Sequence, residues 1–283
     1  MIPGGNGHIR LLFVIGVCLF VAACGSSGPA RPQPGTPAFN WLVAKDAYKA
    51  GDFNKSTEVL TRLAERANEY TDQARPWAMT ITLAMTTGYL ELADKYDEGG
   101  KRNRTAPGPF RKIASEYKSR AGATAMEYLE LAHKFTGVNK DKDVKLVFEL
   151  PQAGLEDPVQ YKKITQGQLI QDSERLAVEA EVIKRDILRN VLRALNTPKD
   201  PAKARAMYQN GEATAPGQNF LFMMAKGLYD ASEAFGPKKQ DQPQRVKVMY
   251  TEALEALGMI KDSKEAKDLI KKITDAQKKL RLS

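Results

Sequence analysis

Proton transfer is the first chemistry to consider in this sequence of 283 residues, and histidine is the side chain best suited to it near neutral pH. The chain has two histidines, His8 and His133. His133 follows Met126 and Leu129 at a spacing that shares one face of a helix. We therefore expect His133 to border the hydrophobic core and not to act as a catalytic base.

Paired carboxylates are a second route to acid and base catalysis, since two such groups divide the roles when their surroundings separate their pKa values. The pairs Glu179 with Glu181 and Glu252 with Glu255 have this composition. We expect both pairs to lie on solvated helix faces, where such separation is small. No enzymatic activity is therefore predicted.

Metal and phosphate sites are disfavoured by the residue content. The only cysteines, Cys18 and Cys24, lie in the first 24 residues, so the rest of the chain forms neither a disulfide framework nor a CxxC metal site. A single histidine follows position 24, which excludes multi-histidine metal sites. The phosphate-binding pattern GxxxxGK[ST] is absent. We expect no metal and no cofactor.

The amino-terminal end carries a targeting pattern. Arg10 precedes the apolar run LLFVIGVCLFVAA at residues 11–23, which is the layout of a secretory signal peptide. A helix that spans a bilayer needs roughly 20 apolar residues, so this run is too short to be one. We expect residues 1–23 to be a signal peptide.

The end of this run, Val21-Ala22-Ala23-Cys24, resembles the lipobox of bacterial lipoproteins. The resemblance implies cleavage before Cys24, a diacylglycerol on its thiol and an acyl chain on its new amino group, which together anchor a protein stably. Gly25 replaces the aspartate that retains such lipoproteins in the inner membrane. The resemblance thus implies export to the periplasmic face of the outer membrane in a Gram-negative cell. An ordinary signal peptide and an uncleaved anchor are the alternatives.

A stretch rich in Gly, Ser and Pro follows the cysteine. This composition opposes helix formation and suits a flexible spacer. We expect residues 24–38 to be the lipidated cysteine and its tether, and residues 39–283 to be the folded body, with a possible subdivision near 140–160. The body is basic, but it lacks a stacking-aromatic motif, so we expect no nucleic-acid partner.

Apolar residues recur three and four positions apart from Phe39 onward, which predicts an all-α fold of antiparallel helical hairpins. Pro198 ends the longest helix because proline lacks the amide donor. Seven apolar residues define one face of this helix: Leu169, Leu176, Ala180, Ile183, Ile187, Val191 and Leu195. The predicted helices cover residues 40–50, 54–69, 76–98, 110–135, 166–195, 201–210, 219–235, 242–257 and 263–280.

One segment, residues 143–150, alternates apolar and polar side chains as a strand does. Pro151 ends it, and the sequence shows no partner strand of similar quality. We interpret it as an extended crossover packed on helices, with a β-hairpin or pairing with another chain as alternatives.

Residues 41–60 resemble a tetratricopeptide repeat, in which two antiparallel helices meet at a Gly-Asp-aromatic turn. Gly51, Asp52 and Phe53 match the turn, and Ala44 and Ser56 match the small residues where the helices touch. Later copies are degenerate, so a plain helical bundle is the alternative to a repeat array. The resemblance implies a concave surface for a protein or peptide partner.

Two further segments are candidate binding surfaces. Five cations flank a loop that has no acidic residue between positions 99 and 115: Lys101, Arg102, Arg104, Arg111 and Lys112. This loop is a candidate for anionic lipid headgroups or envelope polymers, or a solvated connector. The segment 220–224 is the most hydrophobic after the leader; it is predicted to be core, and Met224 and Tyr229 would line a groove if one exists.

These observations favour a lipid-anchored envelope protein that binds a protein or peptide of the cell envelope as a scaffold or assembly factor. A helical carrier of a small ligand or lipid that serves an envelope transporter is the alternative. The sequence does not indicate the oligomeric state.

Overall fold

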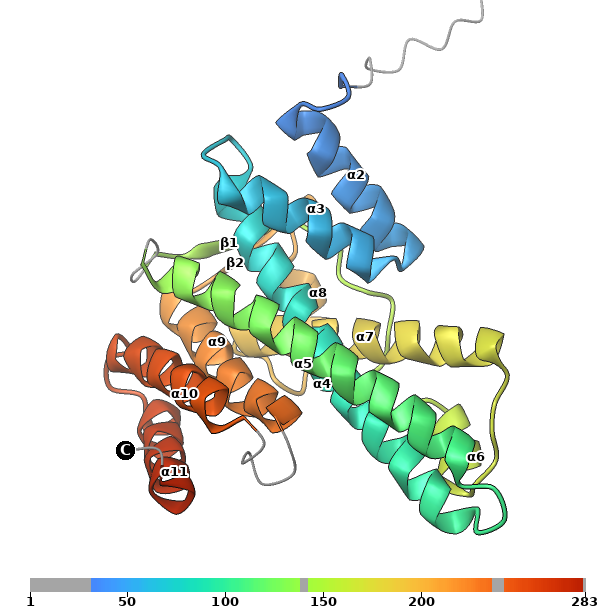
Figure 1. Cartoon of the computed structure of the whole chain (residues 1–283). Coiled ribbons are helices and arrows are strands. Elements are labelled where there is room, and N and C mark those ends of the chain that lie inside the picture. The colour runs from blue at the N-terminus through green and yellow to red at the C-terminus, as the bar shows by residue number, and fades with distance from the viewer. Residues whose placement is uncertain (1–31, 138–141, 236–241, 282–283) are drawn as a thin grey trace, which may run out of the picture.

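The computed structural model describes residues 32–137, 142–235 and 242–281. The predicted signal peptide and the predicted lipid-attachment site, Cys24, lie outside these ranges. The described chain is all-α apart from one small sheet (Figure 1). Its elements are α2 (Pro37–Ala50), α3 (Phe53–Glu65), α4 (Thr71–Arg102), α5 (Gly108–Thr136), β1 (Val144–Leu146), α6 (Gln160–Thr165), α7 (Asp172–Ala194), α8 (Pro201–Met207), β2 (Ala213–Ala215), α9 (Gly217–Ala231), the 3-10 helix η1 (Ser232–Phe235), α10 (Pro243–Gly258) and α11 (Lys264–Leu280).

The first hairpin, α2 and α3, is set by its turn residues. Gly51 has a φ of 79°, a left-handed conformation that glycine adopts without steric cost. Asp52 then caps α3, because its side chain accepts a hydrogen bond from the amide of Lys55 at 3.0 Å. The buried Ser56 hydroxyl donates to the carbonyl of Ala44 at 3.1 Å, which fixes the close approach of the two helices.

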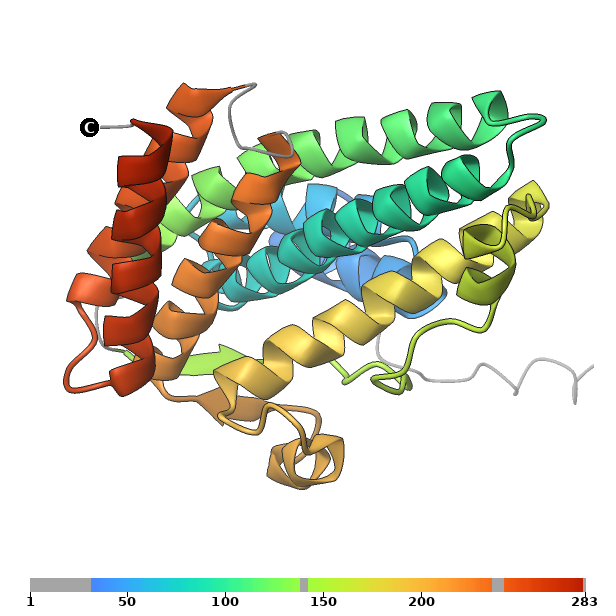
Figure 2. The same cartoon turned by 90° about the horizontal axis from the view of Figure 1, so that it is seen from below.

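The long helices α4 and α5 form an antiparallel hairpin that is the centre of the molecule. Figure 2 shows α5, α4 and α7 as successive layers, with the α2–α3 pair behind α4. Gly99 makes close packing possible at the far end, since a Cβ there would lie only 2.2 Å from the carbonyl oxygen of Ile164 in α6. The core is therefore organised around α4, which packs against α3, α5, α6, α7 and α9.

An aromatic cluster joins α2 to α4 and to the segment after β1. Trp41 stacks on Tyr70 at 5.0 Å between ring centroids, and it meets Trp77 edge-on at 5.2 Å. Trp77 in turn stacks on Phe148 at 5.2 Å. The Tyr48 hydroxyl donates to the carbonyl of Glu149 at 2.9 Å. Aromatic pairs of this kind add stabilisation beyond their burial.

The carboxyl-terminal helices form a second group. α9 packs on α4, α5 and α7, α10 runs beside α9, and α11 packs on α10 at the outside (Figure 1). The hydrophobic segment 220–224 is core, as predicted: Phe220, Leu221, Met223 and Met224 are fully buried.

The extended segment has a partner strand that was not predicted from the sequence. β1 pairs antiparallel with β2, and Lys145 lies opposite Thr214. β2 is the short sequence Ala213-Thr214-Ala215, which has neither the length nor the bulky side chains that mark a strand. The segment is extended and packs on α4, as expected, but it is paired with a strand and is not an unpaired crossover.

The predicted helix at 166–195 is too long. The helix α7 begins only at Asp172, so residues 166–171, which were expected to be its first turns, form the loop between α6 and α7. Leu169 and Leu176, which were expected on its apolar face, are exposed. Gly167 has a φ of 84° in this loop. Leu169 lies in the loop at a helical spacing from Leu176 by coincidence.

Candidate functional site

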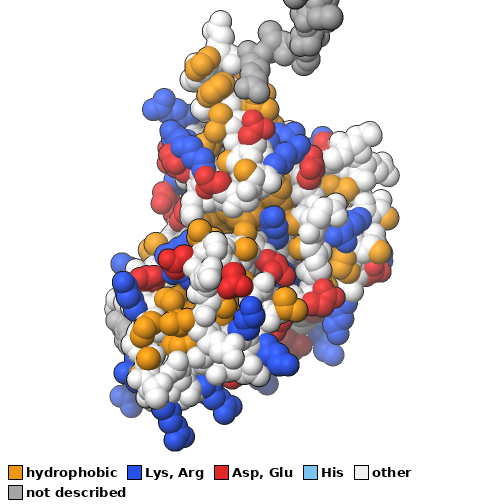
Figure 3. Space-filling model, turned by 90° about the vertical axis from the view of Figure 1, so that its right-hand side faces the viewer, with side chains coloured by type: hydrophobic (Ala, Val, Ile, Leu, Met, Phe, Trp, Pro, Cys, Tyr) orange, Lys and Arg blue, Asp and Glu red, His pale blue; other side chains and the backbone are white. Residues whose placement is uncertain are grey.

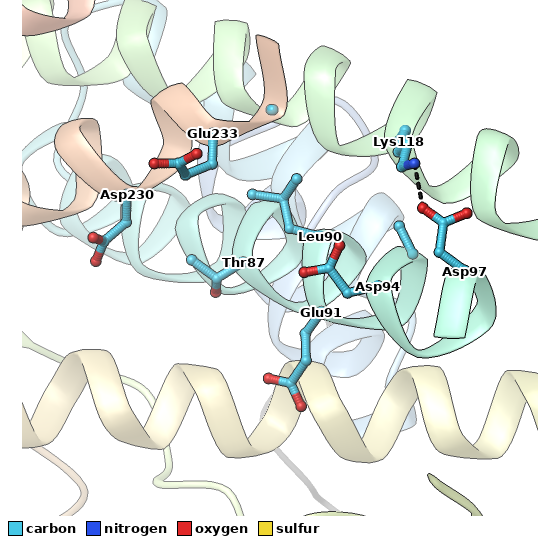
Figure 4. Close-up of a pocket in the computed structure, with 10 residues that line it drawn as sticks. Thr87, Leu90, Glu91, Asp94, Asp97, Lys118, Asp230 and Glu233 are labelled. Atoms are coloured by element: carbon cyan, nitrogen blue, oxygen red, sulfur yellow. Dashed lines mark hydrogen bonds and ion pairs between the residues drawn. The ribbon is translucent and has the colours of Figure 1, made fainter. Parts of the chain in front are cut away.

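A cleft of about 840 Å³ lies beside the carboxyl-terminal half of α4. Its lining comes from α4, from Lys118 of α5, and from Asp230, Glu233 and Ala234 at the junction of α9 and η1. Figure 4 shows Leu90 and Asp94 of α4 on the side of Glu233, whereas Glu91 is directed toward α7 and Asp97 toward Lys118. The cleft thus joins residues that are more than one hundred positions apart in the sequence.

The α4 wall follows from helical spacing. Thr87, Leu90, Glu91, Asp94 and Asp97 recur three or four positions apart, so they form one stripe along the helix. The neighbouring faces bury large side chains in the core, among them Leu92 and Tyr96. Packing of these core residues therefore fixes which way the acidic stripe points.

The cleft is acidic in a chain whose formal net charge is +9. Five of its lining residues are carboxylates and one is a lysine: Glu91, Asp94, Asp97, Lys118, Asp230 and Glu233. The carboxylates come from two facing walls, which concentrates negative potential between them. The arrangement favours a cationic ligand.

Three of these carboxylates have cationic partners at the edges of the cleft. Asp97 pairs with Lys118 at 2.5 Å, Glu91 pairs with Arg185 of α7 at 2.6 Å, and Asp230 pairs with Lys226. These pairs hold the side chains in place.

Asp94 differs from its neighbours. It makes no hydrogen bond or ion pair with any residue in the described ranges. The residue is exposed to solvent, yet the surrounding protein partly desolvates its carboxyl, and this raises its pKa despite the opposing attraction of Lys118. Asp94 is therefore the cleft carboxylate most available to a ligand.

A buried charge network supports the α4 wall from behind. Arg185 is 1% exposed and donates to Glu91 at 2.6 Å and to Asp157 at 2.8 Å. Its neighbour Asp186 accepts from the Thr87 hydroxyl at 2.8 Å, and burial raises the pKa of the Asp186 carboxyl. Because breaking a buried pair strands a charge, this network resists movement of α4 against α7.

The prediction that the carboxylate pairs are solvated is wrong for one member of each. Glu179 is buried and accepts both guanidinium nitrogens of Arg120, at 2.5 and 2.7 Å. The Tyr89 and Tyr117 hydroxyls donate to the same carboxylate, and burial raises the pKa of both phenols. This arrangement joins α4, α5 and α7 and is structural. Glu181 is exposed.

Glu252 is the second exception. It is buried on α10, and its partner in the pair, Glu255, is exposed. The Thr136 hydroxyl donates to Glu252 Oε1 at 2.6 Å, and His133 Nδ1 lies 2.9 Å from Oε2. His133 was expected at the border of the core, but its side chain is 76% exposed, because it reaches outward over Glu252.

The other predicted site residues are not brought into the cleft. Lys101, Arg102, Arg104, Arg111 and Lys112 are all exposed at the tip of the α4–α5 hairpin, and within the described ranges they form no ion pair. Met224 is fully buried and its carbonyl accepts from the Tyr128 hydroxyl, so it does not line a groove. Tyr229 is half-buried and stacks on Tyr250.

The cleft was not predicted from the sequence. The spacing of Glu91, Asp94 and Asp97 was a signal that one helix face is acidic. Nothing in the sequence indicated that Asp230 and Glu233 lie opposite, because that depends on how α9 packs.

No group of three His, Cys, Asp or Glu side chains among the described residues lies close enough together to hold a metal ion. None of the helices in the described ranges is long and apolar enough to cross a bilayer. No family model, curated protein or solved structure matches the chain.

Proposed function

We propose that this chain is a lipid-anchored scaffold of a bacterial envelope that holds a basic segment of another protein in the cleft along α4. One observation carries the proposal: a cleft of about 840 Å³ presents carboxylates from two facing walls in a chain of opposite net charge. A rigid acidic cleft attracts a Lys- or Arg-rich segment and selects against acidic ones.

Binding fits the cleft better than catalysis does. Glu91, Asp97 and Asp230 are already paired with cations, and a paired carboxylate is poorly placed to exchange protons with a substrate. Asp94 has a raised pKa and makes no ion pair in the described ranges, but acid–base catalysis commonly divides its roles between two groups. We therefore propose a role without enzymatic activity.

The proposed anchor gives the cleft its working location. Twelve residues separate Cys24 from Pro37, where α2 begins, and a chain of that length spans at most about 40 Å. Confinement to such a layer raises the effective concentration of the scaffold for partners in the same membrane. The location proposed is the periplasmic face of the outer membrane.

The test is crosslinking in cells, with a photoreactive amino acid at Asp97 and mass spectrometry of the captured material. We expect a discrete protein that crosslinks through a basic segment. Asp94→Lys reverses the charge of the available carboxylate, and we expect it to reduce capture several-fold. Glu69→Lys makes the same change at an exposed site outside the cleft and should leave capture unchanged.

Two outcomes would contradict the proposal. Equal capture by the Asp94→Lys and Glu69→Lys variants would show that the cleft is not the binding site. A stoichiometric lipid or metabolite in place of a protein partner would replace the scaffold with the alternative, a carrier that serves an envelope transporter.

A further inference from the structure

A second concavity, of about 600 Å³, lies between α5 and α10, and we call it the α5–α10 groove. Its apolar floor is formed by Met126 and Leu129 of α5 and Val248 of α10. Val248 is 52% exposed, one of few large apolar side chains so open to solvent in the described ranges. The groove follows α5 from Met126 to His133, two helical turns, or roughly 10 Å.

The polar groups around this floor are mostly acidic. On α5 the groove is lined by Glu127, Glu130 and His133, and on α10 by Glu252. Glu130 is paired with Lys134 at 2.7 Å. The charge of this glutamate is therefore partly compensated by a lysine at the edge of the groove. Exposed Glu255 adds negative charge near His133.

Glu252 and Glu127 are the carboxylates of this groove that the fold partly removes from water. Glu252 is held by Thr136 and His133. Glu127 accepts a hydrogen bond from the Thr61 hydroxyl of α3 at 3.2 Å, yet burial still raises its pKa. A partly desolvated carboxylate is a strong partner for a cation that reaches it, because the local dielectric is low.

We propose that the α5–α10 groove binds an amphipathic basic peptide segment, with apolar side chains on Met126, Leu129 and Val248 and a Lys or Arg directed to Glu127 and Glu252. Charge complementarity selects this occupant: an apolar floor with an acidic rim suits a ligand that is both apolar and cationic. Its length of two turns matches the anchors i, i+3 or i+4, and i+7 that helices place in grooves.

His133 competes with the bound cation for Glu252. Its Nδ1 lies 2.9 Å from Oε2 of Glu252, and its side chain is exposed to solvent. The inference goes beyond the proposed function, since this groove is separate from the cleft and does not depend on the lipid anchor.

The probe is a fluorescent peptide of about 14 residues, built from Leu and Lys at helical spacing. Its binding to the purified full chain in a mild zwitterionic detergent, which suits the chain with or without a lipid, is followed by anisotropy, and any binding to detergent is common to all variants. A Leu and Gln peptide of the same pattern measures the apolar contribution alone. We expect the basic peptide to bind at least tenfold more tightly, and the difference to shrink with added salt.

Val248→Lys should weaken binding of the basic peptide about tenfold, because it removes apolar contact and adds a like charge. Leu176→Lys is the matched control, since Leu176 is 62% exposed on α7, away from the groove. Glu252→Gln keeps the shape of the side chain and should weaken the basic peptide several-fold while leaving the neutral peptide unchanged. Asp94→Lys removes the attraction of the cleft and should leave the groove component intact.

Equal effects of Val248→Lys and Leu176→Lys would overturn the proposal. Equal affinities of the basic and neutral peptides would also overturn it, because binding would then be purely hydrophobic and would not involve the carboxylates. Loss of all binding in Asp94→Lys would place the probe in the cleft, which would support the proposed function while rejecting this inference.

Discussion

Glu179 and Glu252 are carboxylates that the fold removes from water, and each is held by a different partner. Glu179 faces a guanidinium that is always charged, together with two phenols. Glu252 faces a hydroxyl and an imidazole whose charge depends on pH. The contact of Glu179 with its cation is therefore present at every pH at which the chain is folded, whereas the charge on the imidazole beside Glu252 depends on pH.

The contact between His133 and Glu252 predicts a pH-dependent contribution to stability. The hydrogen bond to Glu252 raises the pKa of His133. A raised pKa means that the folded chain holds the proton more tightly, so the contribution is present at low pH and lost as pH rises through the raised pKa. We expect His133→Gln to be less stable than the native chain near about pH 5 and equal to it near about pH 9.

Chemical denaturation at both pH values measures this difference, and NMR titration of the ring gives the pKa directly. The ring signal is assigned by its loss in His133→Gln. A His133 pKa at or below its ordinary value, or a stability difference that grows with pH, would refute the assigned contact.

Removal of Arg120 tests the permanent contact. Arg120→Ala leaves Glu179 charged and buried without its cation, which costs about 2 kcal/mol of unfolding free energy, less than a wholly buried pair because Arg120 is partly exposed. The double variant Arg120→Met, Glu179→Met should recover part of the loss. Urea denaturation measures the unfolding free energies of both variants. Lys55→Ala, which removes one partner of an exposed pair, is the control. Equal losses of unfolding free energy in Arg120→Ala and Lys55→Ala would contradict the structural role of Arg120.

At the scale of elements, the sequence predicted the helices well because their apolar spacing is long and regular. It failed where elements are short: α6 and β2 have six and three residues, too few to show a period. α4 begins at Thr71 although Pro76 was predicted as its start. Pro76 is the sixth residue of the helix, so it removes one amide donor from inside the helix, and the helix continues in spite of it. The cleft was missed for another reason, since its walls meet only through tertiary packing.

Substitution of two glycines in the central hairpin distinguishes the effect of packing from the effect of helix propensity. A Cβ on Gly99 would lie 2.2 Å from the Ile164 carbonyl and 2.7 Å from the Phe110 ring, whereas one on Gly122 meets nothing within 4 Å. We expect Gly99→Ala to destabilise the chain by about 2 kcal/mol and Gly122→Ala to stabilise it by up to about 1 kcal/mol. Thermal unfolding of the two variants measures whether their changes in stability have opposite signs. If Gly99→Ala stabilised the chain, α4 and α6 would not be closely packed.

At the scale of the whole molecule, charge is unevenly distributed. The cleft and the α5–α10 groove are acidic, whereas the tip of the α4–α5 hairpin carries five exposed cations. Figure 3 shows blue, red and orange side chains interspersed over one face, so charges of both signs are mixed on that face. A partner that carries basic segments is steered to the two hollows and away from the tip.

The proposed anchor makes a whole-molecule prediction. Cys24→Ser removes the thiol that would carry the lipid, so we expect the chain to leave the membrane fraction of cells. Cys18→Ser changes the other cysteine, in the predicted leader, and should leave fractionation unchanged. Immunoblotting of separated fractions distinguishes them, and a Cys24→Ser chain that stays with the membrane would reject lipidation at this residue.

The aromatic cluster on α2 also has a mechanical meaning. Any pull on the amino-terminal end of the chain reaches the folded body through α2, the first helix after residue 36. Trp41 and Tyr48 fasten this helix sideways to Tyr70, Trp77 and Phe148. A load directed along α2 is then shared by several ring contacts at once, whereas a load that lifts its first turn breaks them one by one. The force needed to detach α2 from the folded body therefore depends on the direction in which the amino-terminal end is pulled.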